Sequence, residues 1–191
     1  MLPLFVATML GLGAAWAQGT GTTIGAQAVT GPDRLPARIV RTNGKQPVMV
    51  ARAGKAICRG TSPEEAAAAL AMTNSIRRQR GLGPLATSPH LQRAAEAHAC
   101  DMASRGVMGH AGSDGSGPSA RVKKAGYRPR MTAENIAAGH FDLNRVHQEW
   151  ARSPGHLSNI LIKGIQHHGI GYALSADGRS VFWATVYAKS R

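Results

Sequence analysis

The order of the expected elements constrains the fold of this 191-residue chain most, because helix starts come first and a hairpin comes last. Ser62 and Ser88 are each followed by proline, a pattern typical of an N-cap residue and the first position of a helix. Later, the strand-like runs 168–174 and 180–188 flank Asp177-Gly178, a pair typical of hairpin turns. This order predicts an α+β domain in which helices pack on a small sheet.

Another capped helix start is expected at Ser153-Pro154-Gly155-His156. Ser153 is expected to accept the capping hydrogen bond, and Pro154 fixes φ at the first helical position. His156 then lies in the first turn, where the positive end of the helix dipole favours the neutral imidazole, the form that binds ligands. The segment is of interest because His110 and Glu134 lie upstream in similarly Gly-rich surroundings.

The start of the chain has the pattern of an export signal. The first 17 residues carry no charged side chain, and Ala15-Trp16-Ala17 fits a small-x-small cleavage site after an apolar run from Leu2. We therefore expect residues 1–17 to be a signal peptide and the protein to be exported, either to a periplasm or out of the cell. A membrane-spanning helix would need about 20 apolar residues, whereas this run ends at Gln18.

Two further parts follow the expected signal peptide. Residues 18–57 are rich in Gly, Thr, Ala and Pro, so we expect a flexible segment with at most a short strand at 38–40. Residues 58–191 carry the helix and strand patterns and are expected to form the folded domain.

The two cysteines, Cys58 and Cys100, favour a disulfide, with free thiols as the alternative. In the helix expected after Ser88, helical rotation puts Cys100 opposite the apolar stripe, which consists of Leu91, Ala94, Ala95, His98, Ala99 and Met102. A thiol on that face is well placed to hold a strand crossing outside the helix, and Cys58 could lie in such a strand. Two cysteines without a second pair do not make a zinc site.

The chain is strongly basic, with 23 Lys plus Arg against 10 Asp plus Glu and a net charge of +13. One cluster consists of Lys123, Lys124, Arg128 and Arg130. In an exported protein this charge favours partners such as anionic envelope polymers, anionic lipids or extracellular nucleic acid, and the alternative is a solvated basic surface. Aromatic residues make up only 5% of the chain, which argues against a base-stacking platform, and no motif for specific nucleic-acid binding occurs.

Several motifs between residues 62 and 190 resemble, in their order, one known family. They are Asn74-Ser75-Ile76-Arg77, Leu91 through His98-Ala99-Cys100-Asp101-Met102-Ala103, Gly109-His110, Asp114-Gly115, Arg121 with Gly126-Tyr127, Glu134-Asn135-Ile136-Ala137-Ala138-Gly139, Trp150, Ser153-Pro154-Gly155-His156, Asn159-Ile160-Leu161, Gly169-Ile170-Gly171 and Trp183. Together they resemble the CAP superfamily of cysteine-rich secretory, antigen 5 and pathogenesis-related proteins, whose module is also called the SCP domain. The compact bacterial branch is the most similar. The resemblance implies a three-layer α-β-α sandwich with a small central antiparallel sheet.

The resemblance also implies a cleft lined by two histidines and two acidic residues, which holds a divalent metal in some members. By motif, the histidines are His110 and His156, and one acid is Glu134. The position of the second acid is Ser153, a poor zinc ligand without negative charge. His110, His156 and Glu134 could still bind Zn²⁺ with water as the fourth ligand, or Glu134 could instead orient a histidine.

These observations leave three hypotheses about function. The preferred one is a binding module whose cleft accepts a lipid-like, peptide or cell-envelope ligand. The alternatives are a metal-assisted or His/Glu general-base hydrolase of peptide or wall substrates, and a structural or signalling domain with a vestigial cleft. No G-x-S-x-G or H-E-x-x-H motif occurs, and we assign no catalytic residue. Ser153 and His156 are disfavoured as nucleophile and base, because the cap is expected to engage the Ser153 hydroxyl.

Other residues are expected to have structural roles. His98 lies on the apolar stripe and is expected to be a hydrogen-bonded core residue. Asn74 and Arg77 are expected to tie the first helix to neighbouring backbone, and Gly169 and Gly171 to permit close packing on their strand.

Overall fold

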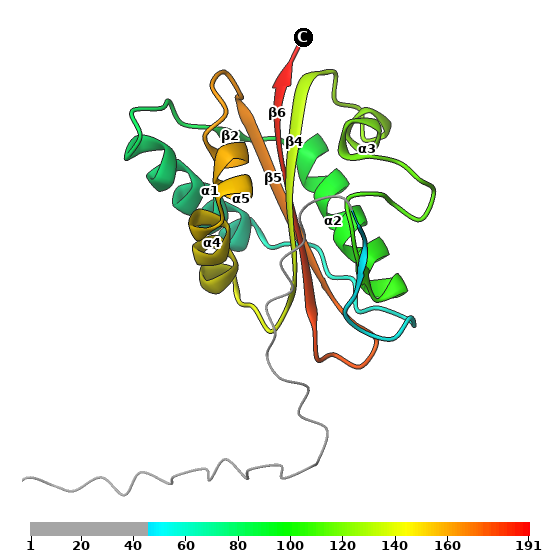
Figure 1. Cartoon of the computed structure of the whole chain (residues 1–191). Coiled ribbons are helices and arrows are strands. Elements are labelled where there is room, and N and C mark those ends of the chain that lie inside the picture. The colour runs from blue at the N-terminus through cyan, green and yellow to red at the C-terminus, as the bar shows by residue number, and fades with distance from the viewer. Residues whose placement is uncertain (1–45) are drawn as a thin grey trace, which may run out of the picture. The chain divides into compact units, whose positions relative to one another are not determined.

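The computed structural model describes residues 46–191 (Figure 1). The expected signal peptide and the expected strand at 38–40 lie outside these residues. Within the described part of the chain, no helix is both long and apolar enough to span a membrane.

The central sheet has four strands in the order β2-β5-β6-β4. These strands are β2 (Ala86–Thr87), β4 (Pro129–Gly139), β5 (His167–Leu174) and β6 (Val181–Ser190). β5, β6 and β4 pair in antiparallel fashion, whereas the short β2 runs parallel to β5. The expected terminal hairpin is thus β5–β6, and it turns through Gly178 with a φ of 69°. β4 lies at one edge of the sheet.

Helices cover both faces of this sheet. They are α1 (Pro63–Arg78), α2 (Pro89–Arg105), α3 (Pro118–Lys124), α4 (Leu143–Arg152) and α5 (Pro154–Ile160). Figure 1 shows α1, α4 and α5 on one side of the strands and α2 and α3 on the other. The fold is therefore an α+β, three-layer α-β-α arrangement, as predicted.

Alternation along β6 supplies side chains to two separate cores. Phe182 is buried among residues of α2 such as Leu91 and Met102. Its neighbour Trp183 is buried on the opposite face, against the layer that includes Trp150 of α4. All six residues of the apolar stripe predicted for α2, His98 included, are buried.

The contact of α2 with β5 is unusually close and depends on two glycines. A Cβ at Gly169 would lie 2.4 Å from the backbone N of Gln92, and one at Gly171 would lie 2.3 Å from that of Glu96. No side chain fits at such distances, so the expectation of close packing at these two glycines is confirmed.

The predicted disulfide is present between Cys58 and Cys100, whose Cα atoms are 5.3 Å apart. Residues 46–57, the last part of the segment expected to be flexible, lie against the domain. Within them, β1 (Val48–Met49) pairs with β3 (Val107–Met108), and Ile57 forms an isolated bridge with Leu174. The disulfide therefore holds down a stretch of chain that crosses the outside of α2.

Two of the three expected serine caps are confirmed and one is wrong. Ser62 accepts a hydrogen bond from the Glu65 N–H, and the Glu65 carboxylate accepts one from the Ser62 N–H, which completes the capping box. Ser88 caps α2. Ser153 makes no side-chain cap bond, because it is the single residue between α4 and α5 and ends the first helix while starting the second.

Candidate functional site

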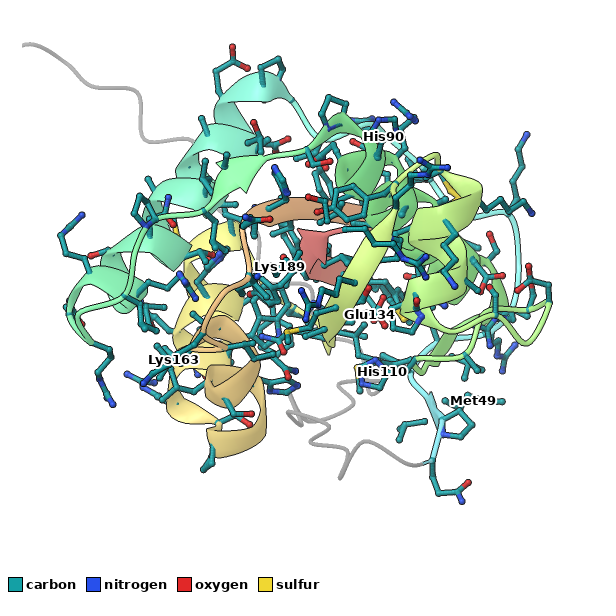
Figure 2. All side chains as sticks on the ribbon, turned by 90° about the horizontal axis from the view of Figure 1, so that it is seen from above. Met49, His90, His110, Glu134, Lys163 and Lys189 are labelled. Carbon is teal, nitrogen blue, oxygen red and sulfur yellow. A yellow bond between two sulfur atoms is a disulfide. The ribbon has the colours of Figure 1, made fainter. Side chains whose placement is uncertain are left out.

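The candidate site is built around the buried carboxylate of Glu134 on β4. One carboxylate oxygen, Oε1, lies 2.8 Å from Nδ1 of His110, and the other, Oε2, lies 2.6 Å from Nη2 of Arg121. The Glu134 side chain is 1% exposed, whereas that of His110 is 34% exposed. Figure 2 shows Glu134 and His110 side by side next to β4. The structure thus brings together two of the residues predicted to line a cleft.

The position of β4 at the sheet edge lets side chains from both helical layers meet there. Glu134 shares a face with Ile136 and Ala138, which belong to the core under α2. The next residue, Asn135, points to the opposite layer and donates to the backbone carbonyl of His156 in α5 at 3.1 Å. His110 therefore approaches the edge from the α2 layer and His156 from the α5 layer.

A short polar network fixes α5 against β4. Asn159 donates to the Glu134 carbonyl at 3.1 Å and to the Asn135 side-chain oxygen at 2.8 Å. The first bond satisfies a buried backbone carbonyl, and the second links the two asparagine side chains. They also set the position of the helix that carries His156.

Arg121 joins Glu134 to the loop that carries His110. Its Nη1 donates to the His110 carbonyl at 2.9 Å and also to the carbonyl of Ser116. The guanidinium thus holds both the carboxylate and the backbone of its histidine partner. Arg121 belongs to the family-like motifs, but its role is visible only in the folded chain, where α3 directs it at β4.

The surroundings of Glu134 keep it ionised. Burial by itself would raise the pKa of Glu134, but the hydrogen bond with His110 and the charges of His98 and Arg121 outweigh burial and lower it. His98 is buried, with Nε2 3.0 Å from the Gly109 carbonyl and 3.8 Å from Glu134 Oε1. Burial lowers the pKa of His98. The expectation of a hydrogen-bonded core histidine is confirmed.

His156 is partly buried in the first turn of the short helix α5. Burial is the main cause that lowers its pKa, and the neighbouring charge of His110 adds to it. His156 therefore favours the neutral form near pH 7, as expected. The helix dipole was the expected cause, whereas in the structure the cause is burial together with His110.

Glu134 is not free to act as a ligand of the metal that the family resemblance implies. Both Glu134 oxygens are engaged, one of them by a guanidinium, and Nδ1 of His110 is engaged with Glu134. A site with three protein ligands would have to dismantle this ion pair. Among residues 46–191, no three His, Cys, Asp or Glu side chains are grouped so that they could hold a metal ion. We therefore derive no chemical step through a metal.

Comparison with known proteins agrees with the fold and the motifs. The model of the cysteine-rich secretory protein family, CAP, matches residues 70–187, which is more than half of the chain. No curated protein matches the sequence.

Solved structures of SCP-domain and outer-surface proteins share the fold. An extracellular protein containing a SCP domain from Bacillus anthracis has a TM-score of 0.59 at 24% identity, with 66% of this chain covered. An outer surface protein from Borrelia burgdorferi has a TM-score of 0.62 at 21% identity, covering 72% of this chain and 99% of its own. The structure of NaASP2 with Zn²⁺ has a TM-score of 0.52 at 15% identity, covering 70% and 83%. The matched region spans only 41% of the Bacillus anthracis protein.

Proposed function

The chain belongs to the cysteine-rich secretory protein (CAP) family, and we propose that it is an exported binding module. The proposed cleft is walled by His110, Glu134, Ser153 and His156. Its ligand is a lipid-like, peptide or cell-envelope molecule that carries hydrogen-bonding groups. Export is supported by the signal-like first 17 residues and by the extracellular and outer-surface proteins that share the fold.

The charge balance at Glu134 carries this proposal. A carboxylate that assists a general base must stabilise the imidazolium that forms when the base takes up a proton. Here the Arg121 guanidinium lies 2.6 Å from Glu134 and already compensates the carboxylate charge. Glu134 therefore adds less stabilisation to a proton on His110 than an unpaired carboxylate would.

The same geometry suits recognition of a polar group. In the neutral tautomer of His110 whose Nδ1 donates to Glu134, the other ring nitrogen, Nε2, is an acceptor for a ligand O–H or N–H. His156 favours the neutral imidazole, which offers one donor and one acceptor. The two imidazoles can thus orient a hydroxyl or an amide without any reaction.

A hydrolase is the second candidate, because a carboxylate that orients a histidine is the arrangement of many general bases. His110 is accessible, and the Ser153 hydroxyl is not used as a cap. In residues 46–191, however, no serine or cysteine side chain hydrogen-bonds to either cleft histidine, and the two cysteines are joined. A hydrolase would therefore have to activate a water molecule. The third hypothesis, a vestigial cleft, predicts that no probe binds there.

Equilibrium binding of defined probes tests the proposal. The full chain is titrated with a monoacylglycerol, the dipeptide amide Ac-Ala-Ala-NH2 and an N-acetylglucosamine tetramer, one probe for each ligand class. Binding of at least one probe should weaken at least tenfold in His110→Ala and His156→Ala. The matched control, His140→Ala, removes an exposed histidine and should leave affinity within twofold. Binding that ignores both cleft substitutions, or no binding of any probe, would contradict the proposal.

We also propose that the basic surface docks the protein on an anionic envelope polymer or lipid. A cavity of about 500 Å³, separate from the histidine cleft, is lined by Lys123, Tyr127, Arg128, Pro129 and Arg191. No acidic residue lines it. Retention on immobilised poly(glycerol phosphate) should fall with salt, and the double variant Lys123→Gln/Arg128→Gln should elute earlier than the control Arg78→Gln. Co-elution of the double variant with the wild type would remove this part of the proposal.

A further inference from the structure

One end of the domain presents positive charge without any nearby carboxylate side chain. It is the end at which α1 and α5 stop, β4 begins and β6 finishes, and we call it the basic end. Its exposed or half-buried cations are Arg78, Arg80, Lys123, Arg128, Arg130, Lys163, Lys189 and Arg191. They all belong to segments of the sequence without Asp or Glu, namely 66–95, 115–133, 150–176 and 178–191.

Contacts between distant segments bring these cations together. The buried guanidinium of Arg77 donates to the Ile162 carbonyl at 3.1 Å, which joins the end of α1 to the loop that carries Lys163. A Cβ at Gly164 in the same loop would lie 3.8 Å from Nζ of Lys189. The end of α1, this loop and the end of β6 are therefore neighbours.

The basic end extends across the three layers of the fold. Figure 2 looks down on it and shows Lys163 beside α5, Lys189 at the end of the sheet and His90 at the start of α2. On the α3 side, the N–H of Arg191 donates to the Arg128 carbonyl at 3.0 Å, which ties the end of β6 to the chain before β4. The cations thus cover a face in two dimensions, whereas a linear polymer needs only a stripe.

No described carboxylate compensates this face. Among residues 46–191, the ion pairs involve other cations, namely His98, Arg105, His110, Arg121 and Arg145. The opposite end of the strands carries mixed charge, because Asp142 follows β4, and Asp177 lies between β5 and β6 beside Arg179. An anionic surface is therefore attracted to one end of the domain in particular.

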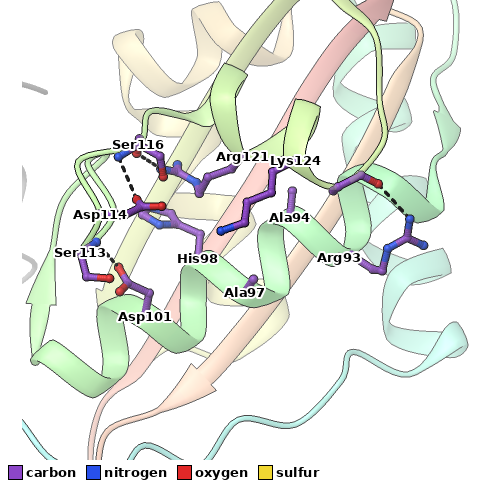
Figure 3. Close-up of a pocket in the computed structure, with 12 residues that line it drawn as sticks. Arg93, Ala94, Ala97, His98, Asp101, Ser113, Asp114, Ser116, Arg121 and Lys124 are labelled. Carbon is purple, nitrogen blue, oxygen red and sulfur yellow. Dashed lines mark hydrogen bonds between the residues drawn. The ribbon is translucent and has the colours of Figure 1, made fainter.

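The basic end stops at a cavity of about 370 Å³ between α2 and α3, whose wall contains both cations and carboxylates. Figure 3 shows Lys124 at this cavity, directed toward Asp114. Hydrogen bonds from Ser116 and the charge of Lys124 lower the pKa of Asp114. Lys124 is thus compensated locally and does not belong to the basic end.

An exposed apolar side chain lies among the cations. Met131 on β4 is 40% exposed, follows Arg130 and is opposite Lys189 in the register of the sheet. Among residues 46–191, the other large apolar side chains with comparable exposure are Met49 and Ile57, which belong to the segment that crosses α2. A bilayer can take up such a side chain at the boundary between headgroups and acyl chains, whereas a phosphodiester polymer offers no apolar interior.

We propose that the basic end docks the protein on the surface of an anionic lipid bilayer, with its cations against the headgroups and Met131 at the acyl boundary. This deepens, and rests on, the anionic docking proposed above for the cavity at Lys123 and Arg128, which is part of the basic end. Each Lys or Arg held near an anionic membrane surface changes binding about fivefold. Ligand binding in the histidine cleft does not depend on this docking.

Co-sedimentation of the full chain with lipid vesicles tests the proposal. Binding should saturate on vesicles of equal parts phosphatidylglycerol and phosphatidylcholine, weaken with added salt, and be absent on pure phosphatidylcholine. The double variant Lys163→Gln/Lys189→Gln should bind at least tenfold more weakly. The matched control, Arg52→Gln/Arg179→Gln, removes the same net charge away from the basic end and should remain within twofold of the wild type.

A single substitution separates a bilayer from a polymer. Met131→Gln keeps the charge and should weaken vesicle binding at least twofold, but it should leave retention on immobilised poly(glycerol phosphate) unchanged. The substituted side chains are exposed or half-buried, so urea unfolding of every variant should match the wild type, which separates a binding effect from misfolding.

Several outcomes would overturn the lipid partner. They are equal binding to both kinds of vesicle, no vesicle binding, equal losses in the two double variants, and unchanged vesicle binding in Met131→Gln. Displacement from vesicles by soluble poly(glycerol phosphate) at equal phosphate concentration would assign the basic end to a polymer instead. If vesicle binding fails while retention on the polymer persists, the lipid partner is wrong and the anionic docking proposed above still holds.

Discussion

Replacing Arg121 by methionine should destabilise the fold by about 3–5 kcal/mol at pH 7, since removal of one partner leaves a buried charge uncompensated. The ion pair that is lost joins Arg121 Nη2 to Glu134 Oε2 at 2.6 Å, and the two side chains are 11% and 1% exposed. The variant also loses the donor to the His110 carbonyl, so the loop 109–117 loosens at the same time. Methionine retains much of the aliphatic volume and limits any packing loss.

The expected penalty depends on pH in a defined direction. The pKa of Glu134 is held below its ordinary value of 4.5, so its ionised form contributes stability that is present above about pH 4.5 and lost as pH falls through the folded pKa. Without Arg121, one of the groups that lower the pKa of Glu134 is missing, so burial raises that pKa above its value in the wild type. The difference between variant and wild type should therefore be largest near neutral pH and shrink in acid.

Urea unfolding followed by tryptophan fluorescence at several pH values measures this difference. The matched control is Arg105→Met, which removes the i,i+4 ion pair of Arg105 with Asp101. These two side chains are 29% and 23% exposed, so the loss of the pair should lower the free energy of unfolding by less than about 1 kcal/mol. A loss in Arg121→Met no larger than in the control, or a loss that does not vary with pH, would refute the assigned role of Arg121.

Three further perturbations have expected outcomes. Replacing Cys58 and Cys100 together by serine should lower the free energy of unfolding by about 4 kcal/mol, because the bridge closes a loop with a sequence separation of 42. Alkylation without reductant should label no thiol in the wild type, and two labelled thiols would contradict the pairing. Gly171→Ala should lower the free energy of unfolding in urea by at least about 2 kcal/mol, since its Cβ would meet the α2 backbone. In the control Gly83→Ala, the Cβ meets nothing within 4 Å, and stability should change by less than about 1 kcal/mol. Equal effects would argue against the close contact. Burial lowers the pKa of His168 from 6.5 to about 3, so in acid the unfolded chain binds a proton that the native chain does not. As the pH decreases below about 6.5, the free energy of unfolding should therefore decrease, by up to about 1.4 kcal/mol per pH unit from this group. This dependence should be weaker in His168→Gln, and an unchanged slope would contradict this reasoning.

The helix starts and the terminal hairpin could be predicted because their signals are local. Ser62 and Glu65 satisfy each other within one turn, and Gly178 sets the hairpin turn between strands that are adjacent in the chain. Ser153 shows the limit of this argument. Its sequence is that of a cap, but the cap bond depends on how two helices meet at one residue.

The strand β4 was not predicted, because its buried positions include polar residues whose partners are distant in the chain. Glu134 is paired with Arg121 on one face of the strand, and Asn135 is bonded to α5 on the other. The sequence of β4 therefore lacks the regular alternation of apolar and polar residues by which a strand is predicted. The capped helix start drew attention to His156, but only the family resemblance predicted that His110, Glu134 and His156 line one cleft. The roles of Arg121 and His98 depend on burial and on atom-to-atom distances, which no spacing in the sequence contains.

We propose that His110 and His156 orient a ligand without turnover, in a cleft where Arg121 compensates the charge of Glu134. The most direct test incubates the full chain with the probe that binds most tightly and recovers the probe by mass spectrometry after many hours. The wild type should retain the probe, His110→Ala and His156→Ala should release it, and the probe should be recovered intact in every case. A hydrolysis product that forms with the wild type and disappears in His110→Ala would contradict the proposed binding role and establish the cleft as a catalytic site.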